Sequence, residues 1–392
     1  MSIRRWLPLA GLVLCVFVFN MSEFMPIGLL TSIADDFGVS ESDAGYLISV
    51  YAWAVALLSL PMMLLLRRVQ YRAMLLFFVA MFALFQILSG LATDYWMLMF
   101  SRLGVAIAHA VFWSIAAPLA VKVVDPEYQR PALSCIAAGT SIAMIIGLPL
   151  GRTIGLAVGW RASFASIAVV TMMILVLLLL VFPKVENPGT FSVKRMPDIY
   201  GNRILMGVYL LIALFVTGYY TCYSYIEPFM LEVVGMDPKM VTLALTLFGI
   251  AGIGGSILFS KLYGVTKYTF LFISPAGVLA SLLLLGPASF SGAAVMCVCL
   301  MWGLFGTMTV ISYQNELILA SPPDAVAVAM SLFSGIFHIG LAMGAIVGGV
   351  VVDIPGPEVL GSNGAVFVLA AVVFVGLFLI RWIRTADAQR SE

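Results

Sequence analysis

Twelve apolar segments, each long enough to cross a lipid bilayer, constrain the fold of this 392-residue chain more than any other feature. A membrane-spanning helix needs about 20 mostly apolar residues, and lipid leaves the backbone of an open, non-helical segment without hydrogen-bond partners. The segments cover residues 7–33, 42–66, 72–92, 95–121, 131–157, 162–183, 204–231, 239–260, 267–286, 291–319, 325–352 and 362–382. The sequence therefore predicts an all-α membrane protein with twelve transmembrane helices.

Composition agrees with this class. Hydrophobic residues make up 62% of the chain and charged residues only 10%, whereas soluble domains average about 45–50% and about 25%. The net charge of +1 offers no field that would attract a polyanion, so nucleic acid is excluded as a partner. The expected surroundings are the lipid bilayer, and a monomer is the default expectation.

Basic residues and one polar stretch organise the spans. Of the 20 Lys and Arg, only Arg152, Arg161 and Lys239 fall on the side opposite the termini, while Arg102 lies within a span. Since Lys and Arg concentrate in cytoplasmic loops, both termini are expected in the cytoplasm. The longest polar stretch lies between the sixth and seventh spans, as a transporter made of two pseudo-symmetric halves requires. The predicted parts are a six-helix half at 1–183, a cytoplasmic linker at 184–203 and a six-helix half at 204–392.

Small residues recur at every fourth position in the fifth span and again in the eleventh, its equivalent in the second half. Such stripes allow helix backbones to approach closely. Either generic packing or control of a gate explains them. The residues that we assign to gating and helix packing are Gly139, Gly147, Pro149 and Gly151.

Sequence motifs argue against an enzyme or an ATP-driven pump. The chain contains no G-x-x-x-x-G-K-[ST] loop, no H-E-x-x-H and no nucleophile elbow, so neither a nucleotide motor nor a catalytic group is predicted. Its five cysteines form no C-x-x-C, and neither a metal site nor a cofactor is expected. Transport against a gradient would have to use an ion gradient.

A few ionisable residues interrupt the apolar spans, and they are the main candidates for coupling. A charged group at the centre of a spanning helix costs about 2.5–3.5 kcal/mol, so it persists mainly where it faces a cavity. A carboxyl in a poorly hydrated cavity exchanges protons nearer neutral pH than one in water. Glu23 is therefore the leading proton carrier, although a carboxyl held permanently by Arg102 is the competing interpretation. His109 completes the proton-coupling candidates as a titrating or hydrogen-bonding group, with a core histidine bonded to a neighbouring helix as the alternative.

Polar and aromatic side chains at helical spacing are the candidates for a substrate cavity between the halves. Tyr220, Tyr223 and Glu227 share one face of the seventh span, and hydroxylated rings suit sugars or planar amphiphiles. An aromatic belt at the membrane interface is the alternative. Glu316 is expected to be merely solvated near the cytoplasm. The full set of substrate-binding candidates is Asn20, Tyr51, His109, Trp113, Tyr220, Tyr223, Glu227, Gln314, Ser334 and His338.

Several of these segments also resemble a known family. Arg102-Leu-Gly104 resembles the arginine motif of the major facilitator superfamily. Gly147-Leu-Pro149-Leu-Gly151 resembles the glycine-proline motif of its drug:proton antiporters. The loop Arg67-Arg68-Val-Gln-Tyr-Arg72 keeps the basic character of the first superfamily signature without its usual Gly and Asp. More specifically, six segments resemble bacterial sugar efflux transporters of the SotB type, at 20–30, 51–53, 108–114, 147–152, 223–229 and 332–337.

The resemblance implies a proton-coupled antiporter in the bacterial inner membrane that exports arabinose-like sugars, thiogalactosides or small drugs. His338 stands where that group is expected to have Asn. The first alternative is a multidrug or nucleoside:proton antiporter, because one scaffold serves many substrates. An uncoupled uniporter or channel is a more remote alternative.

Overall fold

The structure, a computed structural model, describes residues 3–66, 69–185, 196–322 and 326–391. Arg67, Arg68 and linker residues 186–195 lie outside these ranges. Within them the regular structure is helical throughout, and eleven helices are long and apolar enough to cross a membrane. The fifth predicted span is also helical over 129–158, although it is divided into three pieces. The prediction of an all-α membrane protein with twelve spans is confirmed.

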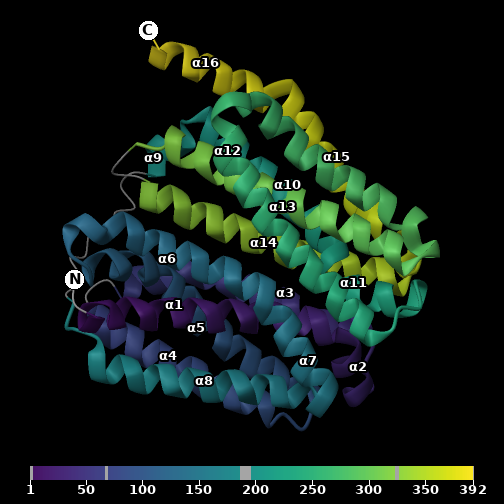
Figure 1. The fold of residues 1–392 in the computed structure, drawn as a ribbon, viewed down its shortest axis with the longest axis horizontal. Helices are drawn as coiled ribbons and strands as arrows, with labels where there is room; N and C mark the ends of the chain where they lie inside the picture. The colour runs from purple at the N-terminus through teal and green to yellow at the C-terminus, as the bar shows by residue number, and fades with distance from the viewer. Residues whose placement is uncertain (1–2, 67–68, 186–195, 323–325, 392) are drawn as a thin grey trace. The chain divides into compact units, whose positions relative to one another are not determined.

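One compact unit comprises Met1–Ser40 and Val50–Phe191, which contain the first six spans apart from the first turns of the second. Figure 1 shows its long helices running side by side. Its elements are α1 (Ile3–Phe24), η1 (Met25–Leu29), α2 (Leu30–Phe37), α3 (Glu41–Leu65), α4 (Tyr71–Gly90), α5 (Tyr95–Lys122), η2 (Pro126–Tyr128), α6 (Gln129–Ile142), η3 (Ala143–Gly147), α7 (Leu148–Val158) and α8 (Trp160–Val181).

The second unit comprises Ser192–Glu392 together with Glu41–Ser49 of α3. Its remaining elements are α9 (Met196–Tyr200), α10 (Arg203–Tyr223), α11 (Ile226–Pro228), η5 (Phe229–Val233), α12 (Pro238–Leu285), η6 (Pro287–Phe290), α13 (Gly292–Ala320), α14 (Val326–Asp353), η7 (Pro357–Val359), α15 (Leu360–Phe374), η8 (Val375–Leu379) and α16 (Ile380–Ser391). The long helix α12 contains the eighth and ninth spans, joined at a kink where Thr266 leaves helical geometry (φ −121°, ψ 30°).

Two predicted helix ends differ from the structure. The sequence predicts an unbroken seventh segment to residue 231, but α10 ends at Tyr223. Pro228 explains the break, because a proline ring clashes with the carbonyl group four residues earlier, here that of Ser224. The sequence predicts that the last segment ends at residue 382, but helix continues through α16 to Ser391.

Proline also breaks the first span, and this break lies beside its buried carboxyl group. The α-helix ends at Phe24, and the next turn, η1, is a 3₁₀ helix with Pro26 near its start. Proline has no backbone N–H and cannot complete the α-helical hydrogen-bond ladder. Glu23 is therefore in the last α-helical turn before an irregular turn whose residues are all buried.

The two glycine stripes pack in equivalent ways within their own units. A Cβ atom added at Gly147 would lie 3.1 Å from Cβ of Met21, so the fifth span contacts the first. A Cβ atom added at Gly340 would lie 2.9 Å from Cβ of Val216, so the eleventh span contacts the seventh. The predicted close approach of helices is confirmed: the fifth span lies along the first, and the eleventh lies along the seventh.

Candidate functional site

The first unit contains a buried chain of three titratable side chains. The Tyr51 hydroxyl is 2.7 Å from Nδ1 of His109, and Nε2 of His109 is 3.6 Å from a carboxylate oxygen of Glu23. The exposed fractions are only 2% for Tyr51, 1% for His109 and 7% for Glu23. They come from α3, α5 and the end of α1, so three spans meet at this imidazole.

This arrangement allows the imidazole to pass on the state of the carboxyl group. A neutral imidazole has one N–H donor and one acceptor nitrogen, and a hydroxyl can either donate or accept. When the Tyr51 hydroxyl donates to Nδ1, the proton is on Nε2 and faces Glu23. When Glu23 is protonated, it can donate to Nε2 once their 3.6 Å separation shortens to hydrogen-bond distance. The proton of His109 is then on Nδ1, and the Tyr51 hydroxyl accepts the hydrogen bond from it. Protonation of Glu23 is thus coupled to a change of the His109 tautomer and to a reversal of its hydrogen bond with Tyr51.

Arg102 lies beside this group and is 1% exposed. Its Nη1 donates to the carbonyl oxygen of Ser22 at 2.9 Å and to the Ser22 hydroxyl at 3.2 Å. Its guanidinium carbon is 4.3 Å from the centre of the Tyr51 ring, a cation–π geometry. Arg102 therefore contacts both Ser22, the residue before Glu23, and the ring of Tyr51, whose hydroxyl contacts His109.

The other predicted residues of this unit lie close by. The ring of Trp113 is centred 6.2 Å from that of His109, one helical turn further along α5. Asn20 is buried, and its amide donates to the carbonyl oxygen of Val16 at 2.8 Å, within its own helix. The structure thus brings Glu23, Tyr51, His109 and Trp113 together, while this bond of Asn20 is local.

The second unit contains a cluster of aromatic rings around α10. Tyr223 packs on Phe248 with ring centres 5.0 Å apart, and Tyr219 packs on Trp302 at 5.2 Å. Tyr220 contacts Tyr219 at 5.2 Å. Three helices, α10, α12 and α13, supply these rings. Phenolic and indole edges beside aromatic faces make this cluster suited to a ligand with both polar and apolar sides.

The remaining candidates of this unit are more scattered. His338 is 8% exposed and bonds through Nδ1 to the carbonyl oxygen of Ser334 at 2.8 Å, while the Ser334 side chain is exposed. Phe337 connects His338 to the aromatic cluster, since its ring lies 6.1 Å from that of Tyr220. Glu227 is buried in α11 at 1% exposure, and Gln314 is half-buried in α13.

Residues 12–327 match the model of the Major Facilitator Superfamily, which is well over half of the chain. The chain belongs to the major facilitator superfamily. It is therefore a secondary transporter, a multi-pass membrane protein that carries a small molecule. The drug:proton antiporter branch and the SotB type remain predictions.

Solved structures agree on the fold of this superfamily member. Two crystal structures of a bacterial homologue of the human lysosomal transporter Spinster are similar to it, one inward-facing and unoccupied, the other inward-facing and occupied. The first has a TM-score of 0.74 at 15% identity over 98% of both chains. The second has a TM-score of 0.72 at 15% identity over 99% of this chain and 98% of the other. At this identity the likeness shows the fold alone.

Two buried polar residues of this transporter, Gln86 and Ser22, were not predicted as site residues. Gln86 donates through its amide nitrogen to the Ser22 hydroxyl, and both side chains are fully buried. Gln86 is a lone amide within an apolar span, and the cost of burying an unpaired amide could have indicated it. The aromatic residues Tyr219, Phe248 and Trp302 were also missed, because single rings in an apolar helix give no signal of a shared cluster.

The interpretation of Glu316 as a merely solvated carboxylate was wrong. Its side chain is 3% exposed and accepts a 2.5 Å hydrogen bond from the Tyr263 hydroxyl. Nζ of Lys267 lies 3.0 Å from Glu316 and 2.7 Å from Asp387, joining α12, α13 and α16. The ammonium group comes from the sequence-distant kink of α12, which a reading of α13 alone cannot supply.

Proposed function

We propose that this transporter is a proton-coupled antiporter that exports sugars, arabinose-like compounds or thiogalactosides, across a bacterial inner membrane by alternating access. The Tyr51–His109–Glu23 group carries the proposal, because it places an imidazole and a carboxyl group side by side away from water. A structural core would be filled more cheaply by apolar side chains, since buried ionisable groups cost several kcal/mol unless well paired. Both termini are proposed to be cytoplasmic and the unit of function a monomer.

In this proposal Glu23 is the main proton carrier and His109 exchanges protons with it. Arg102 keeps the end of α1 in place through Ser22 and lowers the energy of an ionised carboxyl group nearby by its positive charge. The aromatic cluster and the polar residues near it would bind the solute. Substrate and proton then compete through the conformational equilibrium, as reciprocal linkage between two ligands requires.

The proposal is tested by a screen of solutes against purified protein in weakly buffered detergent solution. An exported sugar should release protons on binding, and a pH gradient should drive accumulation of the same sugar in proteoliposomes. A labelled sugar and a lipophilic dye run in parallel separate the sugar exporter from the multidrug alternative. Binding of sugar without proton release, together with a transport rate that does not depend on the pH gradient, would support a uniporter instead.

One observation favours the second candidate function, a multidrug or nucleoside antiporter. In the cluster of Tyr219, Tyr223, Phe248 and Trp302, only the two tyrosines carry a hydroxyl group. Flat amphiphiles gain most from stacking on such rings. Substitution of Phe248, a partly exposed ring of this cluster, by Leu should weaken dye binding more than sugar binding if this candidate is correct.

Tyr51→Phe is expected to change the proton position on His109 while leaving the ring that packs against Arg102. Loss of one hydrogen bond of about 0.5–1.5 kcal/mol should lower pH-driven transport by up to about tenfold. The measurement is ¹⁵N NMR of His109, whose two ring nitrogens give distinct shifts in each tautomer. The spectra are recorded in a His338→Gln background, in which His109 is the sole histidine, because the chain has only two.

Tyr46→Phe is the matched control for Tyr51→Phe, since Tyr46 is 42% exposed on the same helix. It should leave both the ¹⁵N shifts and the transport unchanged. Unaltered His109 shifts in Tyr51→Phe would show that Tyr51 does not set the tautomer, whatever the transport rate does.

A further inference from the structure

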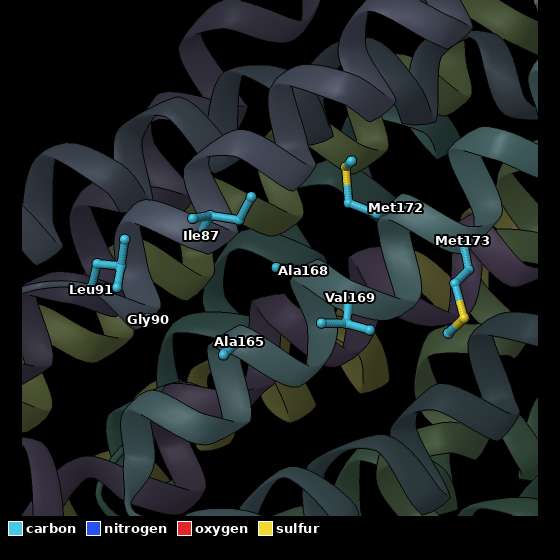
Figure 2. A pocket seen from close by; sticks show the side chains of 8 residues that line it. All are labelled: Ile87, Gly90, Leu91, Ala165, Ala168, Val169, Met172 and Met173. Carbon is cyan, nitrogen blue, oxygen red and sulfur yellow. The ribbon is translucent and has the colours of Figure 1, made fainter.

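Helices α4 and α8 border an apolar groove on the surface of the first unit, with a volume of about 360 Å³ (Figure 2). Small residues of both helices, Gly90, Ala165 and Ala168, line it. A Cβ atom at Gly90 would lie 3.2 Å from the backbone nitrogen of Ala165, so the helices approach closely at this point. Leu91 and Val169 line the groove and are 62% and 60% exposed. In a membrane protein these exposed aliphatic side chains contact lipid.

A charged pair lies at one end of this groove. Arg161 is four residues before Ala165 and seven before Ala168, which places it on the groove face of α8. Its Nε donates to the carbonyl oxygen of Ala92 at 2.8 Å, next to groove residue Leu91. Its Nη1 is 2.7 Å from a carboxylate oxygen of Asp36, and the two side chains remain 36% and 40% exposed. One groove end thus offers both a cation and an anion to the membrane surface.

The charged end of the groove decides which lipid it can bind selectively. An acyl chain that leaves lipid for the groove gains no hydrophobic transfer energy, because lipid tails are as apolar as the side chains. Selection must therefore come from packing and from the head group. Trp96 is 74% exposed close to Ala92 in sequence, as expected for a ring at the level of lipid head groups.

The local charges favour a zwitterionic head group over an anionic one. Besides Asp36, two further exposed acids are near this end in the sequence, Asp35 beside Asp36 and Asp94 two residues after Ala92. These acids outnumber the cation Arg161. A guanidinium group has five N–H donors, so its bonds to Ala92 and Asp36 leave further donors for a phosphate. A primary ammonium group can pair with the exposed carboxylate, and an anionic lipid would be repelled.

We propose that this groove is a binding site for one phosphatidylethanolamine-type phospholipid. One acyl chain lies along the small residues between α4 and α8, the phosphate contacts Arg161, and the ammonium group contacts Asp36. The site is independent of the proton-coupling proposal, because none of its residues belongs to the Tyr51–His109–Glu23 group.

Native mass spectrometry of delipidated protein, titrated with phosphatidylethanolamine or phosphatidylglycerol, tests this site. The wild-type protein should retain one phosphatidylethanolamine in preference to phosphatidylglycerol. Val169→Trp should fill the groove and abolish this single adduct. Leu180→Trp is the matched control, because Leu180 is 81% exposed further along the same helix; it should leave the adduct intact.

The head-group contacts are tested separately by Arg161→Gln and Asp36→Asn. Each should reduce the preference for phosphatidylethanolamine by up to about fivefold, the upper limit for one exposed ion pair. Thermal unfolding of every variant checks that the fold is kept. Equal retention of both lipids by the wild-type protein, or an unchanged adduct in Val169→Trp, would mean unspecific annular lipid and overturn the proposal.

Discussion

Glu23→Gln should abolish accumulation driven by a pH gradient, lowering it by about a hundredfold or more, the effect typical of losing a positioned proton-transfer group. Glutamine keeps the size of the side chain and a hydrogen-bond acceptor for His109, but it cannot bind and release a proton. Exchange of labelled for unlabelled substrate should continue, because exchange does not require net proton movement. The measurement is uptake into proteoliposomes with and without the gradient, alongside exchange at equal pH.

Two further variants make this result interpretable. Asp35→Asn removes an exposed carboxylate twelve positions later in the same span, and it should behave as wild type. Glu23→Asp keeps the carboxyl group and should retain part of the gradient-driven transport. If proteoliposomes with the Glu23→Gln variant still accumulate substrate when a pH gradient is imposed, Glu23 is not the coupling residue and the proton-carrier assignment fails.

Gly344→Leu should destabilise the transporter by about 3 kcal/mol, the upper range for overpacking a closed interface. A Cβ atom on Gly344 would lie 2.5 Å from the Thr217 carbonyl oxygen and 2.9 Å from the Thr221 backbone nitrogen. Backbone cannot move aside as a flexible side chain can, so α14 would be forced away from α10. The expected readout is a lower unfolding temperature in detergent and a lower yield of monodisperse protein.

Gly264→Leu is the control for this substitution. Gly264 lies in the same unit, and a Cβ atom there would meet no atom within 4 Å. A surface change of this kind is usually within about 0.5 kcal/mol of neutral. Equal stability of the two variants would show that the glycine stripe of the eleventh span does not hold α14 against α10.

Much of the site could be predicted from residue type and depth in the membrane. An ionisable residue in an apolar span is costly, and this rule alone selected Glu23, Arg102 and His109. The related cost of burying an unpaired neutral amide could have indicated Gln86 as well. The rule could not pair Arg102 with Ser22, because serine is common in spanning helices and carries no charge. Nor could it show Glu316 buried by Lys267, since that contact depends on how α12 bends at Thr266.

The sequence by itself determined that this protein lies in a membrane as a bundle of twelve helices, because apolar length and the need to satisfy every backbone hydrogen bond leave no other structure. It also determined where helices approach closely, because glycine at every fourth position has no side chain to keep a neighbour away. Only the tertiary structure decided which side chains from distant spans share a hydrogen bond. The Tyr51 hydroxyl reaches His109 over 58 residues of chain, and such a distance is fixed by helix packing rather than by any periodicity along the sequence.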